Sequence, residues 1–191
     1  MKLKKDFFQR QTEVVAKELL GNILCTYKDN KLTGGVIVEV ESYYGFDDPA
    51  NHGYKGKTKR NEVIFRNGGY VYVYLNYGIH YLLNISTEAQ DYPSSVFIRA
   101  IEPVYGIDIM KKRRKINDIK NLTNGPAKLT KALGIDKNFN GLSIESDIIF
   151  IEKNRNLKEF EIVKTKRIGI SKGNEFLRRF YIKNSDFVSK K

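Results

Sequence analysis

The sequence feature that most constrains the fold is a two-residue periodicity that recurs along the chain. Valines occupy alternate positions between Gly35 and Tyr44, and tyrosines occupy alternate positions just before the pair Tyr77-Gly78. A period of two points successive side chains to opposite faces of a strand. We therefore predict a long strand over residues 35–44, and a β-hairpin of residues 69–76 and 79–86 that turns at Tyr77-Gly78.

The rest of the pattern adds strands and only a few helices. Further strands are expected over residues 22–28, 96–102, 147–151, 161–166 and 179–182. Helices are expected over residues 12–20, from Pro103 to the basic run 111–115, and from Gly125-Pro126 to Gly134, because proline favours the first turn of a helix and glycine its end. Helices that would join parallel strands are largely missing. These elements predict an α+β fold with a curved, mostly antiparallel sheet and a few packed helices.

The stretch of residues 45–67 shows neither the two-residue period of a strand nor the period of a helix, and it is rich in Gly, Asp, Asn and Lys. A structureless loop of roughly 20 residues is unusual in a compact domain and is more often functional. No internal repeat and no Gly/Ser-rich linker divides the chain, so we expect a single domain over residues 1–191.

The charge balance indicates a polyanionic partner. The chain has 34 Lys+Arg and 22 Asp+Glu, a net charge of +12, and so basic a protein is typical of nucleic-acid binding. The longest apolar run covers only residues 70–75, whereas a membrane helix needs about 20 residues, and the N-terminus lacks the apolar region of a secretory signal. Cys25, in an apolar segment expected in the core, is the only cysteine, which excludes an intrachain disulfide and a Cys-based zinc cluster. We therefore expect a cytoplasmic protein without membrane association.

Aromatic residues gather in one part of the chain. Eight of the twelve tyrosines lie between positions 43 and 81: Tyr43, Tyr44, Tyr54, Tyr70, Tyr72, Tyr74, Tyr77 and Tyr81. In a strand, Tyr70, Tyr72 and Tyr74 project from the same face. Two interpretations stay open for them: a sheet face packed on the core, because aromatic residues favour strands, or a platform on which an unpaired nucleobase stacks. For Tyr43, beside a carboxylate and near a histidine, the second interpretation is favoured.

Two carboxylates, Glu39 and Glu41, share one face of the strand over residues 35–44. Carboxylates on a sheet face are usually solvated, and the pattern alone favours that interpretation. Glu41, however, lies near the end of the strand, and Tyr43 follows two residues later. A carboxylate between tyrosines in a half-buried cleft can have a raised pKa and act as a general base.

Three other features allow both a functional and a structural interpretation. Asp47-Asp48 together with His52 could bind a metal ion, but Asp48-Pro49 is more simply a turn, so no metal site is expected. His80, between apolar residues of a predicted strand, is interpreted as a structural histidine. The basic run 111–115 either contacts phosphates or forms a solvated helix end.

Several blocks of the sequence, taken together, resemble one enzyme family. The blocks are VEVESYYGFDDPANH at 38–52 with the following KRNEVIF, GYVYVYLNYGIHYLLNIS at 69–86, VFIRAIEP at 96–103, NGPAKLTKALGI at 124–135 and LRRFYIKNSDFVS at 177–189. In this order and spacing they are similar to the alkyladenine DNA glycosylases, also called 3-methyladenine DNA glycosylases. The resemblance extends over nearly the whole chain.

The resemblance implies a single-domain fold without a helix-hairpin-helix module, and a monofunctional DNA repair enzyme. Its partner would be double-stranded DNA containing damaged purines, namely 3-methyladenine, 7-methylguanine, hypoxanthine or ethenoadenine. Water would cleave the bond between base and deoxyribose, without a lysine adduct, a backbone cut or a cofactor. We expect a monomer with no obligate protein partner, associated with the nucleoid if the source is bacterial.

The resemblance also implies the catalytic residues. Glu41 matches the general base that orients or deprotonates the attacking water, and Arg99 matches a second residue that holds this water. A carboxylate suits the reaction because its charge stabilises an oxocarbenium-like sugar while its oxygen accepts the proton of the water.

Further matches concern the base and the duplex. Tyr43, His52 and Tyr74 match the walls around a flipped base, and the backbone amides near Ala50 and His52 would donate hydrogen bonds to it. Asn84 matches the residue that crowds the exocyclic amine of normal guanine. Tyr77, at the tip of the hairpin, matches the side chain that enters the duplex.

Two other function classes stay open. A catalytically silent nucleic-acid-binding module would keep the tyrosines and the charge, but it has no need of Glu41 or Arg99. A tRNA-binding relative of the C-terminal domain of methionyl-tRNA formyltransferase, whose fold is similar, would lack the pocket set of Glu, Tyr and His. The presence of Glu41 and Arg99 favours the enzyme over both alternatives.

Overall fold

The computed structural model describes residues 1–190, and its dominant element is one antiparallel sheet. The eight strands are β1 (Ile23–Lys28), β2 (Lys31–Tyr44), β3 (Val71–Asn76), β4 (His80–Ser86), β5 (Ser94–Tyr105), β6 (Ile149–Glu152), β7 (Ile162–Thr165) and β8 (Arg179–Ile182). The main path runs β3-β4-β5-β2-β1-β6, and β8 joins it by pairing with β2 and β7. Each of the expected strands is confirmed, although β2 and β5 begin earlier and β5 ends later than the periodicity indicated.

Short helices cover parts of this sheet. They are α1 (Lys5–Phe8), α2 (Thr12–Leu19), α3 (Ile107–Arg114) and α4 (Pro126–Leu133), with 3-10 turns η1 (Glu62–Phe65), η2 (Ile119–Asn121) and η3 (Lys137–Phe139). The expected helices over 12–20 and after Gly125 are confirmed, and α4 ends at Gly134, whose φ is 71°. Within residues 1–190 the helices form no helix-hairpin-helix module. The fold is therefore α+β, as predicted.

The helix expected to start at Pro103 begins later. Pro103 lies inside β5, opposite Gly35, and α3 starts only after Gly106, whose φ is 68°. The pairing of β2 with β5 shifts register between Gly34 and Gly35, and irregular positions of this kind tolerate a residue without a backbone N–H. The prediction failed because proline is compatible both with a first helical turn and with an interrupted strand.

The hairpin of β3 and β4 turns where the sequence predicted. Tyr77 and Gly78 have φ values of 49° and 70°, and the N–H of Ile79 donates to the carbonyl of Asn76 at 3.0 Å. Residues 45–67, expected as an extended loop, contain η1 as their only helix and no strand.

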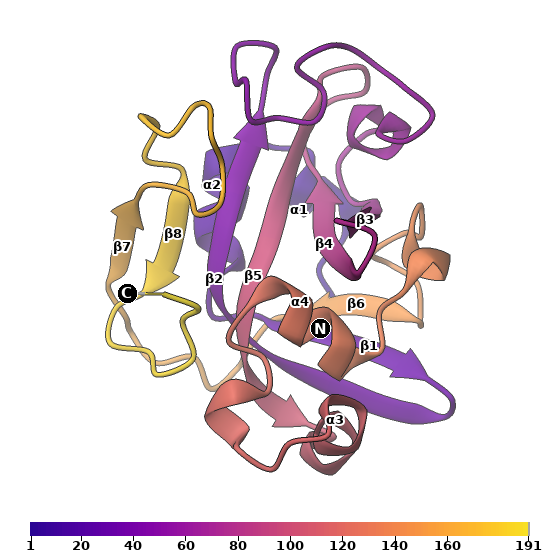
Figure 1. The fold of residues 1–191 in the computed structure, drawn as a ribbon, viewed down its shortest axis with the longest axis vertical. Helices are drawn as coiled ribbons and strands as arrows, with labels where there is room; N and C mark the ends of the chain where they lie inside the picture. Colours follow the sequence, from indigo (N-terminus) through magenta and orange to yellow (C-terminus); the bar gives the residue numbers. More distant parts are fainter. Residues whose placement is uncertain (191) are drawn as a thin grey trace.

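The long strands β2 and β5 are neighbours in the middle of the sheet. Figure 1 shows them side by side, with β7 and β8 beyond β2 and with β3 and β4 on the side of β5. At residues 39–41, β2 pairs with β5 on one edge and with β8 on the other. This segment is thus the middle of three strands, which determines the surroundings of Glu39 and Glu41.

The apolar core lies between the sheet and the helices. Buried residues of α2 (Val15, Ala16, Leu19) and α4 (Leu129, Ala132, Leu133) pack in one cluster with sheet residues such as Ile37, Val40 and Ile98. Cys25 belongs to the buried residues, as predicted, and burial raises the pKa of its thiol to about 12. None of the helices in residues 1–190 has the length and apolar character needed to cross a bilayer.

Candidate active site

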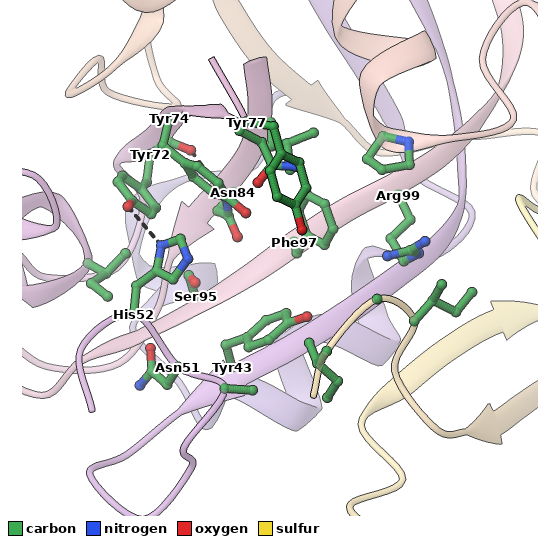
Figure 2. Close-up of a pocket in the computed structure, with 18 residues that line it drawn as sticks. Tyr43, Asn51, His52, Tyr72, Tyr74, Tyr77, Asn84, Ser95, Phe97 and Arg99 are labelled. Carbon is green, nitrogen blue, oxygen red and sulfur yellow. Dashed lines mark hydrogen bonds between the residues drawn. The ribbon is translucent and has the colours of Figure 1, made fainter. Parts of the chain in front are cut away.

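A pocket of about 380 Å³ opens where the β3–β4 hairpin, the loop after β2, β5 and the segment after β7 meet. Figure 2 shows its principal side chains. The lining residues are Tyr43, Ala50, Asn51, His52, Ile64, Tyr72, Tyr74, Asn76, Tyr77, Leu82, Asn84, Ser95, Phe97, Arg99, Pro126, Ile168, Gly169 and Ile170. Every site residue expected from the sequence is in this set except Glu41.

One wall of the pocket is a cluster of three rings. The Nδ1 of His52 and the hydroxyl of Tyr72 are hydrogen-bonded at 2.9 Å, the dashed line in Figure 2. The ring centroids of His52 and Tyr74 are 4.6 Å apart, and those of Tyr72 and Tyr74 are 5.4 Å apart. Although the His52 side chain is exposed to the pocket, desolvation by its surroundings, with a smaller contribution from Arg60, lowers the pKa of its imidazole. These surroundings therefore favour the neutral form of this histidine.

Tyr72 and Tyr74 of β3, and Tyr70 just before this strand, differ in their surroundings. Tyr72 is 2% exposed and packs with Val63, Ile64 and Phe65, in agreement with the interpretation of a packed sheet face, and it also lines the pocket. Tyr70 does not line the pocket, and its hydroxyl contacts the Nζ of Lys5 at 3.0 Å. Burial, followed by the nearby charge of Glu41, raises the pKa of Tyr74 to about 12.

Tyr43, Phe97 and Asn84 line other parts of the pocket. The rings of Tyr43 and Phe97 meet edge to face at a centroid distance of 6.4 Å. Figure 2 shows Tyr43 apart from the cluster of Tyr72 and Tyr74, with Asn84 nearer to that cluster. Asn84 comes from β4 and is 5% exposed.

The backbone N–H groups of Ala50 and His52, both expected to contact a base, differ in whether the protein already supplies an acceptor. The N–H of Ala50 donates to a carboxylate oxygen of Asp48 at 3.1 Å, so this donor is occupied. The N–H of His52 has no acceptor among residues 1–190. Of the two amides, His52 is the one available to a ligand.

Glu41 lies behind the pocket wall. Its side chain is fully buried, so the expectation that Glu39 and Glu41 are solvated is wrong for both. The Oε2 of Glu41 accepts from the Tyr43 hydroxyl at 2.7 Å, and its Oε1 accepts from the Ile168 N–H at 2.8 Å. Burial raises the pKa of the Glu41 carboxyl, and the charge of Arg99 and these two hydrogen bonds oppose that rise.

Arg99 connects Glu41 to a second buried carboxylate. Its guanidinium lies 3.2 Å from the Oε1 of Glu41 through Nη1, and its Nε donates to the Oε1 of Glu39 at 3.0 Å. Arg99 is also part of the pocket wall, as Figure 2 shows. The structure thus brings together Glu41, Arg99 and the base-pocket residues that the sequence indicated.

Of the residues considered for a metal site, Asp48 belongs to a cluster of salt bridges. Asp48 is fully buried, and its carboxylate contacts Arg167 through two bonds of 2.5 and 2.8 Å and Arg178 at 3.0 Å. His52 faces Tyr72 rather than Asp48. Across the described residues no three His, Cys, Asp or Glu side chains are grouped as metal ligands. The Asp48–Arg167 pair fixes the segment after β7, which carries Ile168, against the loop after β2.

Sequence reasoning missed Glu39, Asp48, Arg167 and Ile168 as parts of the site. The residues next to Asp48 in the sequence do not indicate that it is buried, because its partner Arg167 is 119 residues away. The Ile168 N–H acts through its backbone, which no side-chain pattern reveals.

Tyr77 is at the rim of the pocket and 89% exposed. The expectation that it is outside the core is confirmed. Ile79 beside it is 72% exposed. His80 is also exposed, so its interpretation as a structural histidine is wrong; the strand here is the exposed end of the hairpin.

The basic run 111–115 is partly structural. Arg113 donates to the carbonyl of Ala132 at 3.1 Å, and Arg114 donates to that of Leu122 at 3.0 Å. These two guanidiniums join the end of α3 to neighbouring segments.

Comparisons with known proteins identify the family that the chain resembles. A family model described as methylpurine-DNA glycosylase matches residues 6–186. Relatives from Clostridium novyi (strain NT) and Carboxydothermus hydrogenoformans are each 46% identical, with 100% of this chain and 99% and 100% of theirs covered. A relative from Methanoculleus marisnigri is 42% identical with full coverage of both chains. All three carry the name "Putative 3-methyladenine DNA glycosylase".

The family match spans nearly the whole chain, and it includes the strands and loops that build the pocket. The chain belongs to the methylpurine-DNA glycosylase family.

Proposed function

We propose that this chain, a DNA glycosylase by family, hydrolyses the N-glycosidic bond of alkylated or deaminated purines that have been flipped out of duplex DNA. The lesions would be 3-methyladenine, 7-methylguanine, hypoxanthine and ethenoadenine. The observation that carries the proposal is a buried carboxylate, Glu41, held by Arg99 directly behind an aromatic pocket. A base inside a duplex cannot be reached by such a recessed group, so the nucleotide must be extruded.

The pocket suits a planar purine. A base would stack between Tyr43 and the ring cluster of His52 and Tyr74, with the free N–H of His52 as a donor. Methylation at N3 or N7 makes a purine cationic, and electron-rich rings favour a cation by about 0.5–2 kcal/mol. A neutral His52 adds no repulsion to this cation. Asn84, buried in the wall, would crowd the exocyclic amine of guanine.

Glu41 would act on water. Its Oε2 accepts one hydrogen bond, from Tyr43, and a carboxylate oxygen has a second acceptor site. A water reaching this oxygen between Tyr43 and Arg99 would attack C1′ of the sugar as the bond electrons leave with the base nitrogen. Its proton passes to Glu41, and the carboxylate charge stabilises the developing sugar cation. A cationic purine leaves as a neutral base, so it needs little help from an acid.

The charge and the hairpin tip would serve DNA binding. A net charge of +12 supports sequence-independent affinity for phosphates. Tyr77 projects from the rim of the pocket and would fill the gap left by the extruded base. We further propose that the protein acts as a cytoplasmic monomer without an obligate protein partner, a metal or another cofactor.

The test is direct excision. Duplexes carrying a single hypoxanthine or 3-methyladenine are incubated with the protein, and abasic sites are then cleaved by alkali. Strand cleavage that depends on both protein and alkali, and is absent with the undamaged duplex and with Glu41→Gln, would support a monofunctional glycosylase. Tight binding without any base release would overturn the proposal in favour of a silent binding module. Preferential binding of tRNA would favour the RNA-binding alternative.

A further inference from the structure

The last residues of the described chain return to the centre of the sheet. In Figure 1 the C-terminal segment leaves β8, loops away and comes back beside β7 and β8. Its Ser189 donates twice to one carboxylate, that of Glu39: the backbone N–H to Oε2 at 2.6 Å and the hydroxyl to Oε1 at 2.8 Å. Val188, just before it, is 8% exposed, so the segment is packed and not merely close.

Glu39 is fully buried and receives two arginines as well. Its Oε1 accepts from the Nε of Arg99 at 3.0 Å and from the Nε of Arg179 at 2.7 Å. Arg179 in turn donates through Nη2 to the carbonyl of Lys190. The C-terminal segment therefore holds Glu39 directly through Ser189, and a second time through Arg179.

Arg99 depends on Glu39 for its orientation. Its side chain is 7% exposed and has two carboxylate partners, Glu39 at Nε and Glu41 at Nη1. An arginine side chain has many rotamers, and a planar guanidinium keeps one orientation when two of its edges are hydrogen-bonded. If Glu39 moved, the Arg99 guanidinium would lose the contact that aims Nη1 at Glu41 and at the pocket.

We infer that Glu39 and the C-terminal segment docked on it through Ser189 form a positioning device for Arg99, so that base excision needs residues 188–190 although none of these three lines the pocket. Glu39 and Ser189 are positioning residues, since neither touches the pocket. The inference rests on the proposed function.

A series of C-terminal variants tests the inference. Ser189→Ala removes one of the two Ser189 bonds, deletion of residues 189–191 removes both, and Ser189→Thr keeps both. The control is Ser185→Ala, in the same segment, whose hydroxyl accepts only from the N–H of Phe187 in the described chain. Small displacements of a reacting group can lower rates by up to about 100-fold. We expect single-turnover release of hypoxanthine to fall roughly 3- to 10-fold for Ser189→Ala and about 10-fold or more for the deletion.

Binding separates positioning from damage to the pocket. Affinity is measured with a duplex whose hypoxanthine nucleotide carries a 2′-fluorine, because this substituent destabilises an oxocarbenium-like sugar and slows cleavage. We expect the three point variants, which keep every lysine and arginine, to bind it with a Kd within about twofold of the parent, because phosphate contacts supply a large share of the affinity. Ser189→Thr and Ser185→Ala should excise at the parental rate.

A pH profile gives a readout that a merely structural role would not move. The charged and titratable groups facing Glu41 are Glu39 and Tyr43 from β2, Arg99 from β5, Tyr74 from β3 and Arg167 from the segment after β7. Among them, the charge of Glu39 raises the pKa of Glu41. Glu39→Gln removes this contribution, but the Arg99 contact with Glu41, whose charge lowers the same pKa by a larger effect, should be lost with it. The acid limb of the excision profile should therefore move to higher pH, in addition to a fall in maximum rate. If Arg99 stayed in place, only the charge of Glu39 would be lost and the limb would move to lower pH, which would count against the inference.

The outcomes are distinct. Normal excision by the deletion variant, or an equal loss in Ser185→Ala and Ser189→Ala, would overturn the inference while leaving the proposed function intact. If Glu39→Gln is too unstable to assay, the Ser189 series still decides. Failure of the parent chain to release any base would overturn the proposed function, and the inference with it.

Discussion

Truncation of Tyr77 should separate DNA distortion from protein stability. Tyr77 is 89% exposed, so Tyr77→Ala removes almost no buried surface. Its φ of 49° is as unfavourable for alanine as for tyrosine, so the backbone contribution is nearly unchanged. The free energy of unfolding should therefore change by less than about 0.5 kcal/mol, as for other surface substitutions.

The effect on DNA should be much larger. A ring that replaces the extruded base by stacking is worth about 1–3 kcal/mol per base. Without it, the population of the flipped state in the complex should fall by about 5- to 150-fold. A duplex with ethenoadenine reports this step directly, since the fluorescence of this base changes when it leaves the stack. Thermal unfolding of the free protein reports stability.

The matched control is Tyr27→Ala, an exposed tyrosine of β1 that does not line the pocket. It should bind and flip like the parent chain, although its ring, 45% exposed, contributes some packing to thermal stability. A Tyr77→Ala protein that flips ethenoadenine normally would refute the argument, and a marked loss of thermal stability would show that the ring packs in the fold.

Four further predictions follow from the site. Glu41→Gln should keep the affinity for a lesion duplex but slow single-turnover excision at least about 100-fold; a rate near that of the parent would remove Glu41 as general base. Because burial raises the pKa of Glu41 and the base must be ionised, excision should fall on acidification at a higher pH than an exposed glutamate would give, and a rate independent of pH down to the usual glutamate range would contradict this. Excision should persist in EDTA; a loss that zinc or magnesium restores would establish a metal requirement. Asp48→Ala should lower the free energy of unfolding by about 3–5 kcal/mol in urea, because it leaves the guanidinium of Arg167 buried without its charge partner, and a change below about 1 kcal/mol would show that the pair is dispensable.

Local pattern was sufficient for the strands and for the hairpin tip. The alternation around Tyr72 and the turn at Tyr77-Gly78 depend on neighbours a few residues away, and both are confirmed. The exposure of Tyr77 followed from its place in a tight turn. Pro103 shows the limit of such reasoning, since its strand environment is set by Gly35 on a distant part of the chain.

In the candidate site, too, some features were predictable from the sequence and others depended on distant parts of the chain. Residue type and spacing indicated Glu41 and the aromatic tyrosines, whereas Arg99 and the roles of these residues came from the resemblance to a family. The sequence by itself favoured a solvated Glu39 and Glu41, whereas the tertiary structure buries both.

The physical reason is that burial of these carboxylates is a property of the assembled sheet. A strand residue is exposed or buried according to what covers its face, and β8 together with the C-terminal segment, about 140 to 150 residues further along the chain, covers this one. Arg179 and Ser189 from these segments bind Glu39, while Arg99 of β5 and the N–H of Ile168 bind Glu41. These donors compensate the desolvation of the two carboxylates. The spacing of two residues correctly placed Glu39 and Glu41 together, next to Arg99, but irregular pairing of β2 with β5 brings both Ile37 and Val40 into the core. Only the long-range pairing decided that the face of Glu39 and Glu41 is closed to water.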